Sequence, residues 1–197
     1  MSDKTPIDND TIKKIEIVFS QAELSYEQGN YAKVEQDYRQ LLKEQSHYAP
    51  VWIKLAQLYS DLNREHDALQ TLHQALERIA DNADIYYEMG LVQVRLRRFS
   101  KAVTSLAKAA VKAPENAHYS FVYAIALNST QRPYKAIDIL LQALRRHPDN
   151  MEILEALFSI NQDINNHSEA LVFAQKILII EPDNDSIQRY VIKFKKN

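Results

Sequence analysis

Histidine is the most versatile reactive residue type in this sequence, because imidazole serves both as a metal ligand and as a general acid or base near neutral pH. The chain has six histidines, but none belongs to an HExxH motif or to an i, i+4 pair with a ligand-like partner. They share no common spacing, and several fall where turns are expected: His47, His66, His73, His118, His147 and His167. We therefore expect surface or turn histidines, with no metal site and no cofactor.

Other catalytic groups are scarce. The chain has no cysteine, which excludes disulfides, thiolate metal sites and cysteine nucleophiles. Its only two glycines are Gly29 and Gly90, so a glycine-rich phosphate loop cannot form, and no G-x-S-x-G elbow is present. Carboxylates are plentiful but fall on helix faces expected to be solvated or at helix ends. We expect no catalytic residues, and hence a protein that is not an enzyme.

Charge and hydropathy exclude further classes of partner. The formal net charge of -2 gives no electrostatic attraction to nucleic acid, and no apolar run reaches the roughly 18 residues of a membrane-spanning helix. Two basic clusters, residues 95–98 and 145–147, lie near helix ends where cations are favoured; an acidic docking partner is the alternative reading. We expect neither nucleic-acid binding nor membrane insertion.

The N-terminal residues carry no leader pattern. The stretch MSDKTPIDND is polar and acidic and lacks the basic and apolar regions of a signal peptide. The sequence as written therefore predicts a cytoplasmic protein, and a periplasmic one if a leader has been removed. We expect residues 1–10 to be disordered, with Asp10 as the N-cap of the first helix.

The chain repeats with a period of 34 residues. Residues 98–117 read RFSKAVTSLAKAAVKAPENA, and residues 132–151 read RPYKAIDILLQALRRHPDNM, with the same alternation of small and large residues. Without insertion or deletion the period divides residues 15–184 into five units: 15–48, 49–82, 83–116, 117–150 and 151–184. Such a period predicts a stack of similar structural units.

Each unit contains two apolar blocks with helical spacing, separated by a short polar turn. Small residues recur at fixed positions, such as Ala102 and Ala109, where they let two helices approach closely. Units three to five end in proline followed by an acidic residue and asparagine, which predicts that the second helix stops there and that the next helix is capped. Residues 185–197 form one further amphipathic stretch and are expected to cap the stack.

These residues resemble the tetratricopeptide repeat (TPR) family. The resemblance rests on Trp52-x2-Leu55-Ala56-x2-Tyr59 followed by Ala68, Leu72 and Ala75, and it covers residues 15–184. It implies an all-α fold, a right-handed superhelix of antiparallel helix pairs, with repeats over residues 11–184. Gln93 and Asn161 depart from the pattern, since they occupy positions where an aromatic residue or leucine is usual.

The resemblance also implies where a partner would bind, because the first helix of each unit lines a concave groove in this family. The corresponding residues form a largely apolar row that includes two polar side chains: Phe19, Ile53, Lys54, Gln57, Tyr87, Leu91, Phe121, Val122 and Ile125. Only Lys54 and Gln57 suit the family's carboxylate-clamp type, so that type is not expected. The row favours a hydrophobic helix or extended peptide of a partner protein.

Two alternative functions remain open at this point. The apolar row would also suit a homodimer contact in a homo-oligomeric structural repeat protein. Units two to five also look like the TPR modules of bacterial multihaem cytochromes and cytochrome-maturation factors, which implies an accessory or assembly role in respiration. The chain has no CxxCH haem site, so any haem would belong to a partner.

Overall fold

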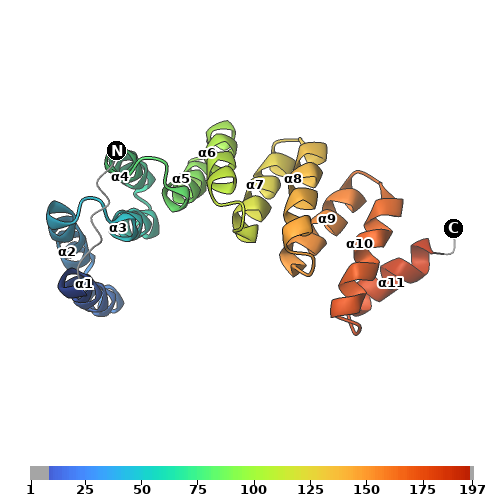
Figure 1. The fold of residues 1–197 in the computed structure, drawn as a ribbon, viewed down its shortest axis with the longest axis horizontal. Helices are drawn as coiled ribbons and strands as arrows, with labels where there is room; N and C mark the ends of the chain where they lie inside the picture. The colour runs from blue at the N-terminus through green and yellow to red at the C-terminus, as the bar shows by residue number, and fades with distance from the viewer. Residues whose placement is uncertain (1–8, 196–197) are drawn as a thin grey trace. The chain divides into compact units, whose positions relative to one another are not determined.

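The computed structural model describes residues 9–195, and over that range the chain is α-helical without strands. Consecutive helices are joined by short turns (Figure 1), which confirms the predicted all-α repeat fold. The helices of the described range are α1 (Asn9–Glu27), α2 (Tyr31–Glu44), α3 (Ala49–Asp61), α4 (Glu65–Arg78), α5 (Ala83–Arg95), α6 (Phe99–Lys112), α7 (Ala117–Ser129), α8 (Pro133–Arg146), α9 (Met151–Asp163), α10 (His167–Ile180) and α11 (Asp185–Phe194).

The first helices of successive pairs start at regular intervals. Helices α3, α5 and α7 begin at Ala49, Ala83 and Ala117, which are 34 residues apart in the sequence. Helix α1 begins earlier, at Asn9, so the predicted N-cap at Asp10 is wrong because Asp10 already lies within the helix. Residues 9 and 10 are helical rather than disordered, while residues 1–8 and 196–197 lie outside the described residues.

Asparagine side chains cap the first helices of several pairs, as the unit ends predict. Asn150 accepts a hydrogen bond from the backbone N–H of Ile153 at 3.0 Å. Asn82, Asn116 and Asn184 make the same bond to the third residue after them. An unpaired N–H of the first helical turn is satisfied in each case, which fixes the point at which the chain re-enters a helix.

Prolines mark the start of one second helix and follow the end of three. Pro133 occupies the first turn of α8, where its missing N–H costs no intrahelical bond. Helices α6, α8 and α10 each end two residues before a proline: Pro114, Pro148 and Pro182. The residue before a proline is driven out of the helical region, so the chain turns there.

The chain divides into two compact units. Unit one runs through Glu88, unit two starts at Met89, and the boundary falls inside α5. The boundary between the two compact units therefore falls within the third predicted repeat, residues 83–116.

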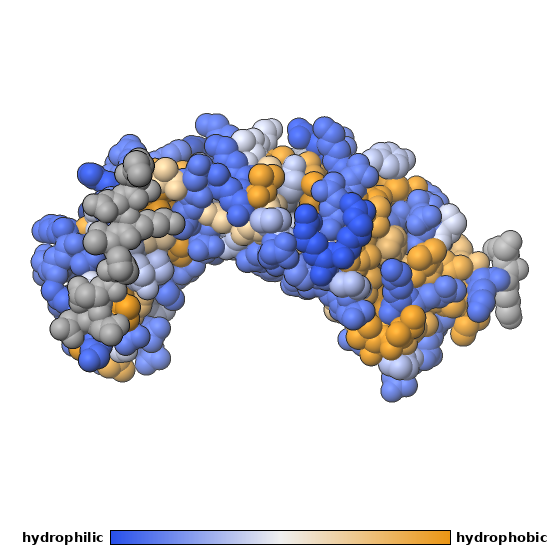
Figure 2. Space-filling view, viewed as in Figure 1, coloured by the Kyte–Doolittle hydropathy of each residue, from blue (hydrophilic) through white to orange (hydrophobic). Residues whose placement is uncertain are grey.

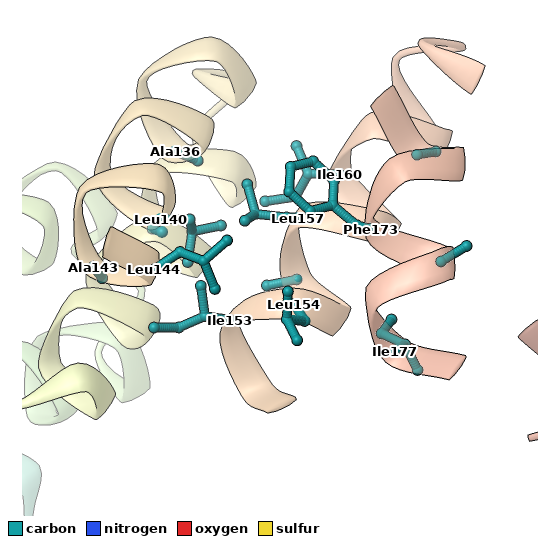
Figure 3. Packing of buried hydrophobic residues seen from close by; sticks show 14 of the residues in the cluster. Ala136, Leu140, Ala143, Leu144, Ile153, Leu154, Leu157, Ile160, Phe173 and Ile177 are labelled. Carbon is teal, nitrogen blue, oxygen red and sulfur yellow. The ribbon is translucent and has the colours of Figure 1, made fainter. Parts of the chain in front are cut away.

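Unit two has a continuous apolar core between its paired helices. Figure 3 shows Leu140 and Leu144 of α8 directed toward Ile153 and Leu157 of α9, with Phe173 of α10 on the other side. Alanines of the predicted small positions complete the cluster and are at most 2% exposed: Ala124, Ala136, Ala143, Ala170 and Ala174. Small side chains on one helix leave room for large ones on the next, so the helices pack closely.

The described part of unit one is built in the same way. Ala22, Ala56, Ala68 and Ala75 are at most 1% exposed. Large side chains fill the space beside them, with Leu72 completely buried and Tyr59 only 1% exposed. The small-residue rhythm in the sequence therefore corresponds to close helix contacts in both units.

Gln93 and Asn161, two polar departures from the family pattern, are buried but paired. In the described residues, the Ser105 hydroxyl donates to Gln93 Oε1 at 2.8 Å. Asn161 Nδ2 donates to the backbone carbonyl of Leu157 at 2.7 Å, and Asn161 Oδ1 accepts from Asn166 Nδ2 at 3.0 Å. Buried polar groups cost little when they are hydrogen-bonded, so both residues fit the core.

Candidate functional site

A pocket of about 330 Å³ opens in unit one between the first helices of its first two pairs, α1 and α3. Its lining is half apolar and half polar, which differs from the largely apolar surface that the sequence predicts. The lining residues are Ala22, Glu23, Tyr26, Glu27, Val34, Tyr38, Lys54, Gln57, Leu58 and Asp61.

A hydrogen bond joins the two sides of the pocket. Tyr26 of α1 donates from its hydroxyl to Asp61 Oδ2 of α3 at 3.1 Å. This hydrogen bond to Asp61 raises the pKa of Tyr26, with burial and the negative charge of Asp61 adding to the effect. The ring of Tyr26 also meets that of Tyr31 edge to face, with centroids 5.2 Å apart. Both contacts hold Tyr26 in place at the mouth of the pocket.

The two polar residues predicted to contact a partner both line this pocket. Lys54 is exposed, and Gln57 is half-buried and donates from Nε2 to Glu88 Oε1 at 2.7 Å. Three carboxylates line the pocket against the single cation of Lys54: Glu23, Glu27 and Asp61. The pocket is therefore negatively charged at neutral pH, which favours a partner with a basic side chain.

The predicted apolar residues of unit one, Phe19, Ile53 and Tyr87, are not among the residues that line the pocket. Phe19 is half-buried and packs edge to face on Tyr38, with ring centroids 5.9 Å apart. Tyr38 itself is a lining residue, so Phe19 supports the pocket wall from behind. Ile53 and Tyr87 are half-buried.

The other four predicted residues belong to unit two. Leu91, Phe121 and Val122 are half-buried, and Ile125 is 38% exposed. Phe121 packs against the core cluster, so part of its ring contributes to folding rather than to a binding surface. The nine predicted residues thus divide between the two units, and the structure brings Lys54 and Gln57 together in one pocket.

Sequence reasoning missed Tyr26, Tyr38 and Asp61 as pocket residues. A signal for two of them was present, because Tyr26 and Asp61 lie on first helices, which the resemblance to the TPR family implies line the groove. The sequence prediction chose a largely apolar row on those helices instead. Tyr38 lies on a second helix, where no groove residue was expected.

Two of the histidines, His118 and His167, have local structural contacts. Nδ1 of His118 lies 3.3 Å from Oε2 of Glu152. Nδ1 of His167 lies 3.1 Å from the Tyr190 hydroxyl, and the imidazole ring of His167 stacks on the ring of Phe194. In the range 9–195 no group of three or more histidine, aspartate or glutamate side chains has an arrangement that could hold a metal ion. Nor does any helix there have the length and apolar character to cross a bilayer.

Comparison with solved structures shows the fold alone, because the identities are low. The structure of MamA matches with a TM-score of 0.70 at 18% identity, covering 84% of this chain and 96% of that chain. YrrB matches with a TM-score of 0.66 at 18% identity, covering 95% of this chain and 98% of that one. A TPR protein from Parabacteroides merdae ATCC 43184 matches with a TM-score of 0.71 at 12% identity, covering 89% of this chain and 70% of the other.

Sequence comparison identifies the family. No curated protein matches the sequence. The matches found give no support to the respiratory hypothesis, which stays a prediction. Two family models described as tetratricopeptide repeat match consecutive segments, residues 25–86 and residues 87–151, and together they span well over half of the chain. Proteins of this family generally act as non-catalytic scaffolds. The chain belongs to the tetratricopeptide repeat family.

Proposed function

We propose that the chain is a non-catalytic scaffold that binds a peptide or helix of a partner protein, and that the partner enters the pocket between α1 and α3. Membership of the TPR family supports a role in protein–protein interaction. YrrB, which shares the fold, is described as a TPR protein with an unusual peptide-binding site. The observation that carries the choice of this pocket is that Lys54 and Gln57, both expected to contact a partner, line it together.

The lining sets the chemistry of the partner segment. Val34, Tyr38 and Leu58 line the pocket but are themselves buried. The ring of Tyr26, which is 38% exposed, offers aromatic surface for one aliphatic or aromatic side chain, whose burial contributes roughly 1.5–3 kcal/mol. The carboxylates of Glu23 and Asp61 attract a basic side chain next to it. We therefore expect an apolar residue beside lysine or arginine in the bound segment.

Site-specific photocrosslinking tests this proposal. A photoreactive amino acid replaces Lys54 in the pocket, and in a matched protein it replaces Lys176, an exposed lysine on the second helix α10. Both proteins are irradiated in native extract, and the crosslinked peptides are sequenced by mass spectrometry. We expect position 54 to capture a discrete partner segment that contains an apolar residue next to a basic one, and position 176 not to capture it. Equal capture at both positions, or no capture at position 54, would contradict the proposal.

A second candidate function, self-association as a homo-oligomeric repeat protein, is favoured by exposed apolar side chains on α10. Ile179 is 80% exposed, Val172 is 45% exposed and Ile180 is 41% exposed. Val172 and Ile179 are seven residues apart and therefore share one face of the helix. Figure 2 shows hydrophobic residues gathered on the surface of the C-terminal helices. Exposed apolar groups of this kind often mark interfaces.

Sedimentation velocity distinguishes this second candidate. Self-association through α10 predicts a wild-type mass above that of the monomer, and a shift to the monomer in Ile179→Glu. A monomeric wild type over a wide concentration range would exclude it.

A further inference from the structure

A second hollow in unit one lies on the side of the second helices. It has a volume of about 930 Å³ and runs between α2 and α4, with residues of α3 as its floor. Trp52, Leu55 and Tyr59 form that floor. None of the residues that line this hollow lines the pocket between α1 and α3, so the two are separate surfaces. We call it the α2–α4 groove.

The walls of the α2–α4 groove carry two facing pairs of glutamines. Gln36 and Gln40 lie on α2, and Gln70 and Gln74 lie on α4. The members of each pair are four residues apart, which is about 6 Å along a helix. An extended polypeptide repeats its backbone groups every two residues, which is about 6.4–6.8 Å. The glutamine spacing therefore nearly matches the spacing of backbone groups in an extended chain.

These amides are available to a ligand. In the described part of the chain the side chains of Gln36, Gln70 and Gln74 make no hydrogen bond, and Gln40 makes only a long one of 3.3 Å to Glu44. A glutamine amide has both a donor and an acceptor, so one side chain can pair with the C=O and the N–H of a peptide backbone. Such pairing does not depend on the sequence of the bound peptide.

The polar groups of the floor, the Trp52 indole N–H and the Tyr59 hydroxyl, are both hydrogen-bonded within the protein, and Trp52, Leu55 and Tyr59 are at most 9% exposed. Trp52 Nε1 donates to the backbone carbonyl of Ser46 at 2.8 Å, so the indole presents hydrocarbon to the groove. Leu42 and Leu55 lie beside it and are buried. Alternate side chains of an extended peptide point to one side of the chain, and those facing inward would rest on this floor.

The ionic groups of the groove are largely neutralised within the protein. Glu35 accepts hydrogen bonds from Arg39 Nε at 2.9 Å, from Arg64 Nη1 at 3.0 Å and from the Tyr59 hydroxyl at 2.8 Å. Arg64 also donates from Nε to Asp67 Oδ2 at 2.7 Å. Lys43, an exposed lysine that also lines the groove, makes no ion pair within the described residues. Because the other charges are already paired, the groove offers little electrostatic attraction to a strongly charged segment.

We propose that the α2–α4 groove binds an extended, uncharged segment of a partner protein by hydrogen bonds between the facing glutamine amides and the backbone of that segment. The 34-residue period places the glutamines at equivalent positions in the first two repeats. The corresponding residues of the third repeat are Thr104 and Lys108. The glutamine pairs are therefore a feature of unit one.

The test starts from a phage-displayed library of random linear peptides selected on the full wild-type chain, with counter-selection against the Gln36→Ala/Gln70→Ala variant. The affinity of an enriched peptide is measured by fluorescence anisotropy, together with that of a derivative in which alternate backbone amides are N-methylated. We expect an enriched peptide without net charge. The double variant should weaken its binding about tenfold or more, and N-methylation in one of the two registers should have a similar effect.

Two matched variants locate the binding. Gln142→Ala removes an exposed glutamine of α8 at the repeat position of Gln74 and should leave the affinity unchanged. Lys54→Glu alters the α1–α3 pocket and should also leave the affinity of this peptide unchanged. The variant therefore distinguishes a failure of the groove proposal from a failure of the proposed function, which rests on the α1–α3 pocket. The inference is overturned if no peptide survives counter-selection, if N-methylation leaves the affinity unchanged in both registers, or if Lys54→Glu rather than the glutamine variant abolishes binding. It is also overturned if a glycan array yields a ligand for the groove and the peptide library does not.

Discussion

A β-carbon placed on Gly90 of α5 would lie 2.6 Å from Cγ of Leu106 of α6, closer than real β-carbons come to any neighbouring atom. Leu106 is completely buried. Gly90 occupies the position where other repeats have Ala22, Ala56 and Ala124. Here even alanine is too large, because α5 and the buried leucine of α6 pack so closely.

Gly90→Ala should therefore destabilise the protein although alanine is the better helix former. Overpacking typically costs about 1–3 kcal/mol, and the gain in helix propensity returns about 1 kcal/mol. We expect a net loss of about 1 kcal/mol in the free energy of unfolding, measured by urea denaturation. In the Leu106→Ala background the clash is absent, so the same glycine substitution should be neutral or stabilising. An equal effect in both backgrounds would show that the contact with Leu106 is not the cause.

The buried pair of Gln93 and Ser105 gives a second prediction. Ser105→Ala removes the hydroxyl that donates to Gln93 Oε1 and leaves that acceptor buried, at a cost of about 1–2 kcal/mol. Replacing both partners, as in Gln93→Leu/Ser105→Ala, removes the unsatisfied group and should recover most of the loss. Thermal unfolding of the single and double variants provides the measurement. A double variant less stable than Ser105→Ala alone would contradict the prediction.

The third prediction concerns pH and Tyr59. Burial, reinforced by the hydrogen bond to Glu35, raises the pKa of Tyr59 from its ordinary value of 10.0 to about 12, against the opposing effect of Arg39. Above pH 10 the unfolded chain loses this proton while the folded chain keeps it, so the unfolded state binds fewer protons. The stabilisation is complete below pH 10 and is lost as pH rises through the folded pKa of about 12.

Tyr59→Phe should thus show a shallower loss of stability between about pH 10 and pH 11 than the wild type does. Urea denaturation at several pH values measures it, and Tyr134→Phe, whose ring is 71% exposed, is the control variant and should follow the wild-type curve. Parallel curves for wild type and Tyr59→Phe would contradict the assignment. Tyr59→Phe also removes the hydrogen bonds of the hydroxyl. The difference in stability between the variant and the wild type at neutral pH measures that loss, and the change in this difference above pH 10 measures the effect of ionisation.

The charge of the α1–α3 pocket gives a fourth prediction. If a basic residue of the partner faces Glu23 and Asp61, affinity for the crosslinked segment should fall as salt is added, because salt screens interactions between exposed charges. Glu23→Gln should weaken binding at low salt and reduce this salt dependence. Affinity that does not change between low and high salt would contradict the electrostatic part of the proposal.

Much of the fold could be predicted from the sequence because the repeat presents the same local signals several times. The small residues at Ala102 and Ala109 predicted close helix contacts, and both are completely buried. Asparagines at the unit ends predicted helix caps, and Asn116 and Asn150 act as such. These features depend on residues near in sequence, where helical spacing fixes which side chains meet.

The candidate site was predicted less well, because it depends on side chains of different helices. Phe19 fitted an apolar binding row, but in the structure it packs on Tyr38. Gln93 and Asn161 read as departures from the family pattern, and each finds a hydrogen-bond partner that spacing alone does not reveal. The α2–α4 groove was not considered, since only first helices were expected to carry a binding surface.

An amide NMR titration of the ¹⁵N-labelled full chain with the segment captured at position 54 tests the central claim most directly. If the chain is a scaffold that receives its partner between α1 and α3, the largest shift changes will fall on Tyr26, Gln57 and Asp61 and their neighbours. Shift changes confined to other helices, with α1 and α3 unaffected at saturation, would contradict the account.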